Sequence, residues 1–396
     1  MKLAVIGFGQ CGGRIADEFC RINNRARSRR KISIIADTFA VNTDTADLTN
    51  LSHIKTDYRH RILIGTRKTN GHGVGKINEL AARIARQDDD KIIDALRTTK
   101  KLYEVDAFLL IAGAAGGTGS GSIPIVAKTI KNRFQDKALY ALVALPFEHE
   151  EQTDARTFYN TATCLKATYS VADAVFLCDN QRYIEKDSSL VNNMGAINQL
   201  IAEPFYDFLC AGEVKKAKHV GVRLLDAGDI METLGGWTTL GYGVEQLATI
   251  KFPFWGGRNF KKKSAEIRRG IEAMEQALSN LSIDCDAGDS ASALYLLSAP
   301  AKEMNMDLVK ELSQYLSEVA PSAVIRYGDF PRQESTLKIT VMLSQLNAVD
   351  KVKKYFDKMP GFIEESAVNR RKNEVKLKEL TNAAVLVPSL FNDNGD

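Results

Sequence analysis

Short apolar runs alternate with amphipathic stretches along the first half of the chain, and many of the runs end at a glycine, an asparagine or an aspartate. This alternation is typical of a parallel sheet with crossover helices, because strands buried on both faces are apolar throughout. Strands are predicted at residues 3–6, 33–36, 62–64, 107–112, 139–145 and 174–178. Helical spacing of apolar residues predicts helices at 75–96 and 121–134. The pattern therefore indicates an α/β fold with a doubly wound, mostly parallel sheet.

A long apolar helix separates this half from a second region. The apolar positions between 191 and 209 predict one largely buried helix, which Pro204 should kink. Beyond residue 248 the pattern predicts helices at 267–278, 308–319 and 349–358, with strands at 293–297 and 337–343. The predicted organisation is an N-terminal domain at 1–190, a central core helix at 191–212, a smaller α+β C-terminal domain at 213–380 and a short tail at 381–396.

Composition excludes several classes of protein but does not identify a function. The chain has 396 residues and a net charge of +4, which gives no general nucleic-acid signal. Its six cysteines include no C-x-x-C pair, and His72 and His149 make no metal pattern. No apolar run reaches about 18 residues and the first one is too short for a signal peptide, so a cytoplasmic protein is expected.

Two short segments of the chain are rich in Lys and Arg. Residues 25–31 and 261–263 are candidates for contact with acidic lipids or nucleic acid. A solvated helix end or loop is the favoured interpretation of both strings. No nucleic-acid partner is predicted.

A first glycine-rich loop, GFGQCGGR at 7–14, follows a strand and opens a helix. Its backbone N–H groups and the helix N-terminus can face an anion. A similar string occurs in dinucleotide-binding folds, and Asp37 would then be the ribose-binding acid at the end of the second strand. From this loop alone, the interpretation as an NAD-dependent oxidoreductase remains an alternative.

A second loop, GAAGGTGSG at 113–121, shifts the balance towards phosphate binding. It lies between a strand and a helix, and only small residues let a backbone approach phosphates closely. A simple tight turn rarely needs five glycines beside Thr118 and Ser120. Two such loops in one sheet predict a single bound triphosphate. A P-loop is excluded, because Asn70 stands where its first glycine should be.

The second loop resembles the GGGTG[ST]G signature of the tubulin and FtsZ superfamily. The string GQCGG, which is Gly9 followed by residues 10–13, resembles the first phosphate loop of that family. The likeness continues in order through 42–44, 71–76, 146–150 and 179–180, and covers about the first 245 residues. It implies a nucleotide site made of Gly9, Gln10, Cys11, Gly12, Gly13, Arg14, Asn42, Gly113, Ala114, Ala115, Gly116, Gly117, Thr118, Gly119, Glu150, Asn180, Met194 and Asn198.

Within this implied site the glycine loops would hold phosphates, Glu150 the ribose, and Asn180 with Asn198 the guanine edge. An Asn amide both donates and accepts, which suits guanine, although each Asn can equally be an ordinary cap or turn residue. Met194 stands where the family often stacks an aromatic ring on the base. Glu148 and Glu151 compete with Glu150 for the ribose, and contact between Arg156 and the nucleotide stays open.

The segment 224–243 resembles the loop that the superfamily inserts into the neighbouring subunit's site. The resemblance implies that Asp226 and Asp229 are catalytic. Two carboxylates three residues apart at a helix start can orient and polarise an attacking water, although helix capping alone would also explain them. Leu224 replaces the family's neighbouring Asn, which implies slower hydrolysis.

Taken together, the resemblance implies a cytoskeletal GTPase that binds GTP or GDP with Mg²⁺ and self-assembles head to tail. No direct protein ligand for a metal is predicted, and a peripheral membrane adaptor is left open. The mixture of tubulin-like and FtsZ-like features is most similar to the archaeal CetZ group, whose members are linked to cell shape. An FtsZ-type division GTPase and a GTP-binding regulator that does not polymerise are the remaining alternatives.

Overall fold

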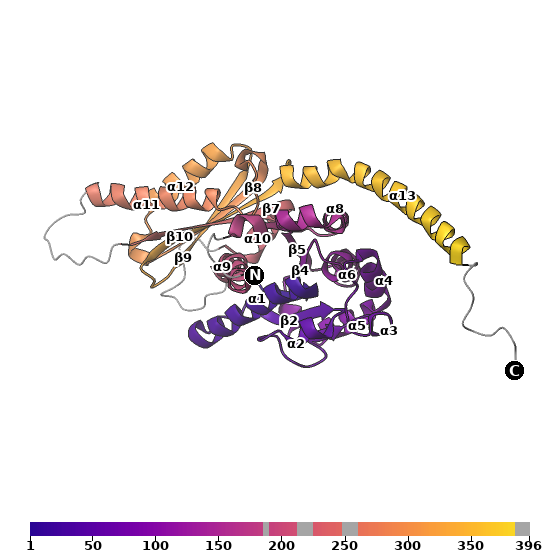
Figure 1. Cartoon of the computed structure of the whole chain (residues 1–396). Helices are drawn as coiled ribbons and strands as arrows, with labels where there is room; N and C mark the ends of the chain where they lie inside the picture. The colour runs from indigo at the N-terminus through magenta and orange to yellow at the C-terminus, as the bar shows by residue number, and fades with distance from the viewer. Residues whose placement is uncertain (185–189, 212–224, 248–259, 385–396) are drawn as a thin grey trace.

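A single ten-stranded sheet runs through the molecule, with helices on both faces (Figure 1). The computed structural model describes residues 1–184, 190–211, 225–247 and 260–384. The strand order is β3-β2-β1-β4-β5-β6-β7-β10-β8-β9. The short tail was predicted at 381–396; residues 381–384 belong to the last helix, and residues 385–396 lie outside the described residues.

The N-terminal part of the sheet is parallel, as predicted. Its strands are β1 (Leu3–Phe8), β2 (Ile35–Asn42), β3 (Arg61–Leu63), β4 (Ala107–Gly113), β5 (Ala138–Leu145) and β6 (Ala174–Asp179). The prediction for β2, residues 33–36, was wrong, because it ended the strand at Asp37. The charge of Asp37 is met by Lys55 and His60, so the apolar residues that follow continue the strand.

The C-terminal part of the sheet is mixed. It consists of β7 (Gly236–Gln246), β8 (Ser290–Ala299), β9 (Val324–Pro331) and β10 (Thr336–Leu346). β7 continues the parallel part, since Gly236 pairs with Ala174 at the start of β6. β10 is antiparallel to β7 and β8, and β9 lies parallel to β8 at the edge.

Two of these strands, β7 and β9, were not predicted. Glycine weakens a strand's local preference, and β7 carries Gly241 and Gly243. A Cβ on either glycine would collide with the backbone of α11 at Ala277 or Ala273, so these glycines permit close packing of a helix on the strand. The glycines that this packing requires also weaken the sequence signal for the strand, so β7 was missed.

Thirteen helices are described, and most match the predictions. They are α1 (Gly9–Arg30), α2 (Thr45–Thr49), α3 (Thr66–Thr69), α4 (Asn78–Gln87), α5 (Asp89–Arg97), α6 (Thr118–Arg133), α7 (Glu148–Thr153), α8 (Ala155–Tyr169), α9 (Leu190–Cys210), α10 (Ala227–Thr233), α11 (Phe260–Ser279), α12 (Met306–Val319) and α13 (Asp350–Ala384). The helix predicted at 75–96 is two helices, separated at Asp88, whose carboxylate accepts from the Gly65 N–H. The last helix is far longer than the predicted 349–358, and the helices α2, α3, α7 and α8 were not predicted.

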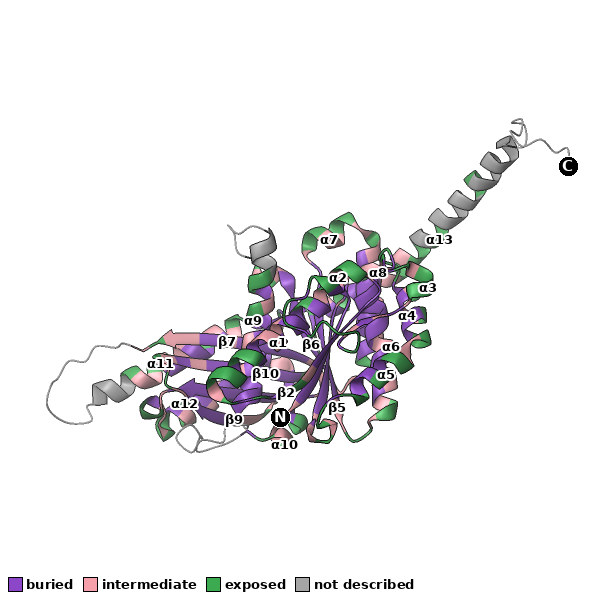
Figure 2. Cartoon of the chain, turned by 90° about the horizontal axis from the view of Figure 1, so that it is seen from below, coloured by how far each residue is buried: buried purple, intermediate pink, exposed green. Residues whose placement is uncertain are grey.

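Two apolar cores lie on opposite faces of the sheet. Helices α1 and α9 cover one face, where Phe205 packs edge-on against Phe19 and Phe176. Helices α4 to α6, α8, α11 and α12 cover the other face. Buried positions follow the strands through the centre in Figure 2, while exposed positions lie on the outer helices. Within the described ranges, no helix is long and apolar enough to cross a membrane.

Candidate functional site

The two glycine loops lie side by side at the carboxyl ends of neighbouring strands. β1 and β4 pair up to Phe8 and Ala112, after which α1 and α6 begin. A Cβ on Gly9 would lie 2.9 Å from the Gly119 nitrogen, and one on Gly113 would lie 2.9 Å from the Cys11 Cβ. Gly9 also has a φ of 67°, which favours glycine. The loops can therefore approach this closely only with glycine at these positions.

The starts of α1 and α6 leave their backbone N–H groups without side-chain caps. Neither the N-cap residue Phe8 nor Gly117 makes a capping bond, and neither first turn holds an acidic residue. Several other helices do have a side-chain cap: Asp154 caps α8 and Asn305 caps α12. Free N–H groups and two positive helix ends thus converge between the loops. This arrangement suits an anion with several phosphate groups.

Side chains on the first loop connect it to α2. The Gln10 amide donates to Asp47 at 2.7 Å, and the buried Asn42 donates to the other Asp47 oxygen at 3.0 Å. Arg14 is exposed on the same first turns of α1. Sequence reasoning flagged Gln10, Arg14 and Asn42 but missed Asp47. Its only signal was its position shortly after Asn42.

The second loop is held by a residue that sequence reasoning also missed. The amide nitrogen of buried Asn160 donates to the carbonyls of Lys76, Ala115 and Gly116 at 2.9, 3.0 and 3.2 Å. The hydroxyls of Thr43 and Thr118 lie 2.7 Å apart and join this loop to the end of β2. Asn160 therefore fixes the backbone of the loop from the opposite side.

Cys11 lies between the loops as a neutral thiol. The pKa of Cys11 is raised to about 11, first because the surrounding protein desolvates the thiol and second because Glu150 carries a negative charge, while the positive charge of Arg14 opposes the shift. A helix N-terminus alone would lower a thiol pKa, so burial outweighs that effect here. The side chains of Glu150 and Arg14 both lie close enough to act on this thiol.

The three acids proposed for the ribose have different surroundings. Glu150 accepts from the backbone at the start of α7 at 3.0 Å. Glu151 accepts from the Tyr355 hydroxyl and pairs with Lys354 at 3.6 Å, so α13 already engages it. The Glu148 side chain is exposed. These contacts leave Glu148 and Glu150 as the freer candidates.

Further along this edge, Asn180 is buried directly after β6, and Asn198 is half-buried on α9. The side chain of Met194 and the whole of Leu224 lie outside the described residues. Arg156 makes a two-pronged pair with Glu79 at 2.9 and 3.2 Å. In this structure the Arg156 guanidinium is therefore paired with a carboxylate of α4.

The dinucleotide alternative loses its ribose-binding acid. Asp37 is the third residue of β2, opposite Ala4, rather than the end of the strand. It pairs with Lys55 at 3.0 Å and lies 3.1 Å from the His60 ring. The first glycine loop begins several residues further along β1, so this part of the prediction was wrong.

Asp226 and Asp229 lie at the opposite edge of the sheet. Asp226 is the N-cap of α10 and accepts from the Asp229 N–H at 2.8 Å, as the capping alternative predicted. The Asp226 side chain is nevertheless exposed, and Arg326 lies 3.8 Å from the Asp229 carboxylate. α10 leads into Gly236, which pairs with the amino end of β6. With about 3.3 Å per residue, the strands hold this pair about 20 Å from the glycine loops.

Comparisons with known proteins identify the family of this chain. Residues 2–186 match the Tubulin/FtsZ family GTPase domain, and residues 187–359 match the Tubulin-like CetZ C-terminal domain. The tubulin-like protein CetZ5 of Haloferax volcanii is 30% identical over 367 residues, which cover 89% of this chain and 90% of that protein. CetZ1 of the same organism is 32% identical over 346 residues, covering 84% of each chain.

Solved structures give the same result. The GDP-bound monomer of CetZ1 from Haloferax volcanii has a TM-score of 0.77 at 28% identity, covering 90% of this chain and 97% of that one. The GTPγS-bound protofilament of CetZ2 from that organism has a TM-score of 0.79 at 27% identity, covering 93% and 100%. The chain therefore belongs to the tubulin-like CetZ proteins of the Tubulin/FtsZ family.

Proposed function

We propose that this protein is a GTP-dependent cytoskeletal GTPase that assembles head to tail, so that each subunit completes the site of its neighbour. The observation that carries the proposal is the position of its two functional groups on opposite edges of one sheet. The glycine loops follow β1 and β4, whereas Asp226 and Asp229 lie beside the amino end of β6. One subunit cannot bring the two together, but a translated copy can.

In this proposal the two uncapped helix starts and the glycine loops bind the phosphates through backbone N–H groups. Glu150 accepts from the ribose hydroxyls, and Asn180 with Asn198 contacts the guanine edge. Mg²⁺ is expected with the phosphates, because it is usually held by phosphate oxygens, water and one or two carboxylates. The Asp47 carboxylate, which faces Gln10 and Asn42, offers such a group. Bound there, the ion would neutralise phosphate charge.

The carboxylates of Asp226 and Asp229 act on water at the neighbour's terminal phosphate. Each can accept a hydrogen bond from that water and so orient it for in-line attack. The exposure of Asp226 leaves its charge available to another subunit. An interface of this kind does not close on itself, and it therefore builds a filament.

One relative supports the assembly part of the proposal: CetZ2 of Haloferax volcanii forms a GTPγS-bound protofilament. TubZ of Bacillus thuringiensis, at 16% identity, shows the fold alone. A role in cell shape rests on the likeness to CetZ proteins. We propose it ahead of a role in division.

The direct test combines sedimentation, GTP hydrolysis and two variants with complementary defects. Asp226→Asn keeps an N-cap residue but removes the charge, so α10 should stay folded. We expect GTP-dependent pelleting to remain and hydrolysis to fall by about a hundredfold or more. Gly116→Leu places a side chain in open space beside the second loop and should block nucleotide binding.

Mixing the two variants then separates the proposed mechanism from its alternatives. Asp226→Asn subunits hold an intact loop site, and Gly116→Leu subunits hold intact acids, so the mixture should regain part of the hydrolysis. Asn305→Ala, which removes an N-cap at a distant helix, is the control for capping alone. No GTP-dependent pelleting of the wild type would refute assembly. A melting temperature raised by NAD but not by GTP would favour the oxidoreductase instead.

A further inference from the structure

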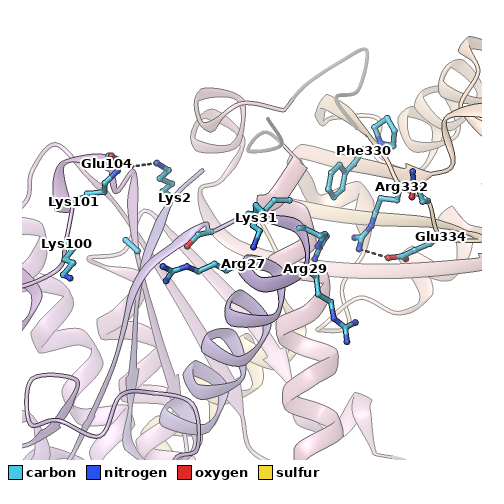
Figure 3. A pocket seen from close by; sticks show the side chains of 16 residues that line it. Lys2, Arg27, Arg29, Lys31, Lys100, Lys101, Glu104, Phe330, Arg332 and Glu334 are labelled. Atoms are coloured by element: carbon cyan, nitrogen blue, oxygen red, sulfur yellow. Dashed lines mark hydrogen bonds and ion pairs between the residues drawn. The ribbon is translucent and has the colours of Figure 1, made fainter. Parts of the chain in front are cut away.

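A second, strongly basic pocket lies between the N-terminal and C-terminal parts of the molecule (Figure 3). It has a volume of about 940 Å³, which is the size of a small-molecule site. Its walls come from the start of β1, the end of α1, the turn after α5 and the segment after β9. These segments lie at the amino-terminal edge of the parallel strands, away from the glycine loops.

The charge of this pocket is one-sided. Two acidic side chains, Glu104 and Glu334, line it, together with the eight basic ones Lys2, Arg27, Arg29, Arg30, Lys31, Lys100, Lys101 and Arg332. This excess is larger than the net charge of +4 of the whole chain. The arginines of the last turn of α1 also suit the negative end of that helix. That effect does not explain Lys2, directly before β1, or Lys100 and Lys101 in the turn after α5.

Several of these cations are left without a counter-charge. Lys2 and Lys101 pair with Glu104, and Arg332 pairs with Glu334. Among the residues that the structure describes, the side chains of Arg27, Arg29, Lys31 and Lys100 make no ion pair. Figure 3 shows Arg27 extending from α1 towards the side of the pocket that holds Lys100. Unpaired cations grouped in a hollow repel one another unless an anion joins them.

One further donor is buried without a partner. The Nη1 atom of Arg30 is buried and makes no hydrogen bond within the described part of the chain. Its other terminal nitrogen lies 3.7 Å from Asp207 on α9, and Asp207 also pairs with Arg332 at 2.9 Å. The three residues thus tie α1, α9 and the C-terminal part together at the side of the pocket. A buried N–H without an acceptor costs free energy, so this contact between α1, α9 and the C-terminal part is only partly satisfied.

The chemistry of the pocket favours phosphate over carboxylate as the ligand. Four of the cations are arginines, whose planar guanidinium groups bind phosphate oxygens in pairs. The uncompensated charge calls for a ligand with several negative charges, and the enclosed volume limits its size. We propose that this pocket binds a small molecule or headgroup that carries two or more phosphate groups, and that it does so separately from the proposed nucleotide site.

Because the ligand would contact α1 on one side and Arg332 on the other, it would also bridge the two parts of the molecule. The probe for the test is inorganic tripolyphosphate, titrated by calorimetry into protein saturated with GDP. Saturation removes competition from the glycine loops. Vesicles of phosphatidylcholine with cardiolipin, whose headgroup carries two phosphates, form a second arm, which distinguishes a membrane surface from a free phosphate compound.

The test compares two double variants, and each of them removes two positive charges. Arg27→Gln/Lys100→Gln removes two unpaired cations of the pocket, and Arg86→Gln/Lys128→Gln removes one Arg and one Lys from a different hollow. We expect the pocket variant to bind tripolyphosphate about tenfold more weakly or worse, and the control to bind as the wild type does. Both variants should keep the wild-type melting temperature and GDP affinity.

Three outcomes would overturn the proposal. They are the absence of binding in both arms, an equal loss of binding in both variants, and binding of polyglutamate as tight as that of tripolyphosphate with the same dependence on Arg27 and Lys100. Binding to vesicles alone, lost in the pocket variant, would support it with a lipid headgroup as the source. A protein that binds no GDP would still give this result with tripolyphosphate, so failure of the proposed function is seen separately.

Discussion

The two edges of the parallel sheet are built in different ways. At the carboxyl edge, glycine loops and helix starts present backbone N–H groups, and several of the loop glycines leave no room for a Cβ. At the amino edge, charged side chains dominate: Asp226 and Asp229 on α10, Arg326 beside them, and the basic pocket between α1 and the C-terminal part. Both edges are proposed to bind phosphates, one through the backbone and one through side chains.

Because of this difference, the two edges should tolerate different amino-acid substitutions. A site made of backbone depends on close approach, so one methyl group added at a position of close contact is enough to break it. A site made of exposed side chains loses one contact at a time, because each surface pair contributes little.

The sharpest contrast within the carboxyl edge is between two neighbouring glycines. A Cβ on Gly12 would lie less than 3.0 Å from the backbone of Ile111, whereas a Cβ on Gly13 would meet Leu51 at an ordinary 3.8 Å. We expect Gly12→Ala to lower the free energy of unfolding by about 3 kcal/mol or more, because neither backbone can move away. Gly13→Ala should be neutral or stabilising by up to about 1 kcal/mol, since Ala favours a helix.

Thermal unfolding of both variants measures this difference directly. The matched positions lie in the same turn of α1, so changes in helix propensity cancel in the comparison. Equal stability of the two variants would show that the first loop is adaptable. The claim that steric fit builds this edge would then fail.

Much of the carboxyl edge could be predicted from the sequence because its rules are local. Apolar runs followed by small residues gave β1, β4 and both glycine loops within two residues of their observed positions. The same local rules failed where packing decided the structure. β7 carries glycines for the close approach of α11, and β9 contains Gly328, Asp329 and Pro331, which locally disfavour a strand.

Contacts that join distant parts of the chain could not be predicted at all. Asn160 reaches Lys76 across 84 residues of sequence, and Tyr355 reaches Glu151 across 204. No periodicity marks either partner, because each side chain acts through a neighbour that only folding brings close. The basic string at 25–31 was visible, but its pocket needed Lys2, Lys100 and Arg332 from other elements.

The next prediction tests whether the carboxyl edge is as desolvated as its packing indicates. The pKa of Cys11 is raised from 9.0 to about 11, so at pH 8 its thiolate fraction is about a hundredfold lower than that of an ordinary thiol. Alkylation of Cys11 by iodoacetamide in the nucleotide-free protein should therefore be about a hundredfold slower than in the unfolded chain. Mass spectrometry of the Cys11 peptide measures both rates.

The same shift has a consequence for stability. The folded state holds the Cys11 proton more tightly than the unfolded chain, so its contribution is complete below pH 9 and is lost as the pH rises through about 11. The other five thiols also have raised pKa values and should add to this alkaline loss. Alkylation at the unfolded rate at pH 8 would mean that water reaches the first loop freely.

The smallest effect is expected at the amino edge, from Arg326. This side chain pairs with Glu232 at 2.6 Å and lies 3.8 Å from Asp229, and its partners are 69% and 42% exposed. Because exposed pairs contribute little, Arg326→Gln should lower the free energy of unfolding by less than about 1 kcal/mol. Arg268→Gln, which breaks a 3.0 Å pair with Glu272 on α11, is the matched control and should cost a similar amount.

The two arginine variants should separate only in GTP hydrolysis. Removing Arg326 frees the Asp229 carboxylate from a neighbouring positive charge, so the hydrolysis rate should change in that variant and stay at the wild-type value in Arg268→Gln. A stability loss above about 2 kcal/mol for Arg326→Gln would place it among the strongly destabilising substitutions. The amino edge would then be as intolerant as the glycine loops, and the contrast between a backbone-built edge and a side-chain-built edge would not hold.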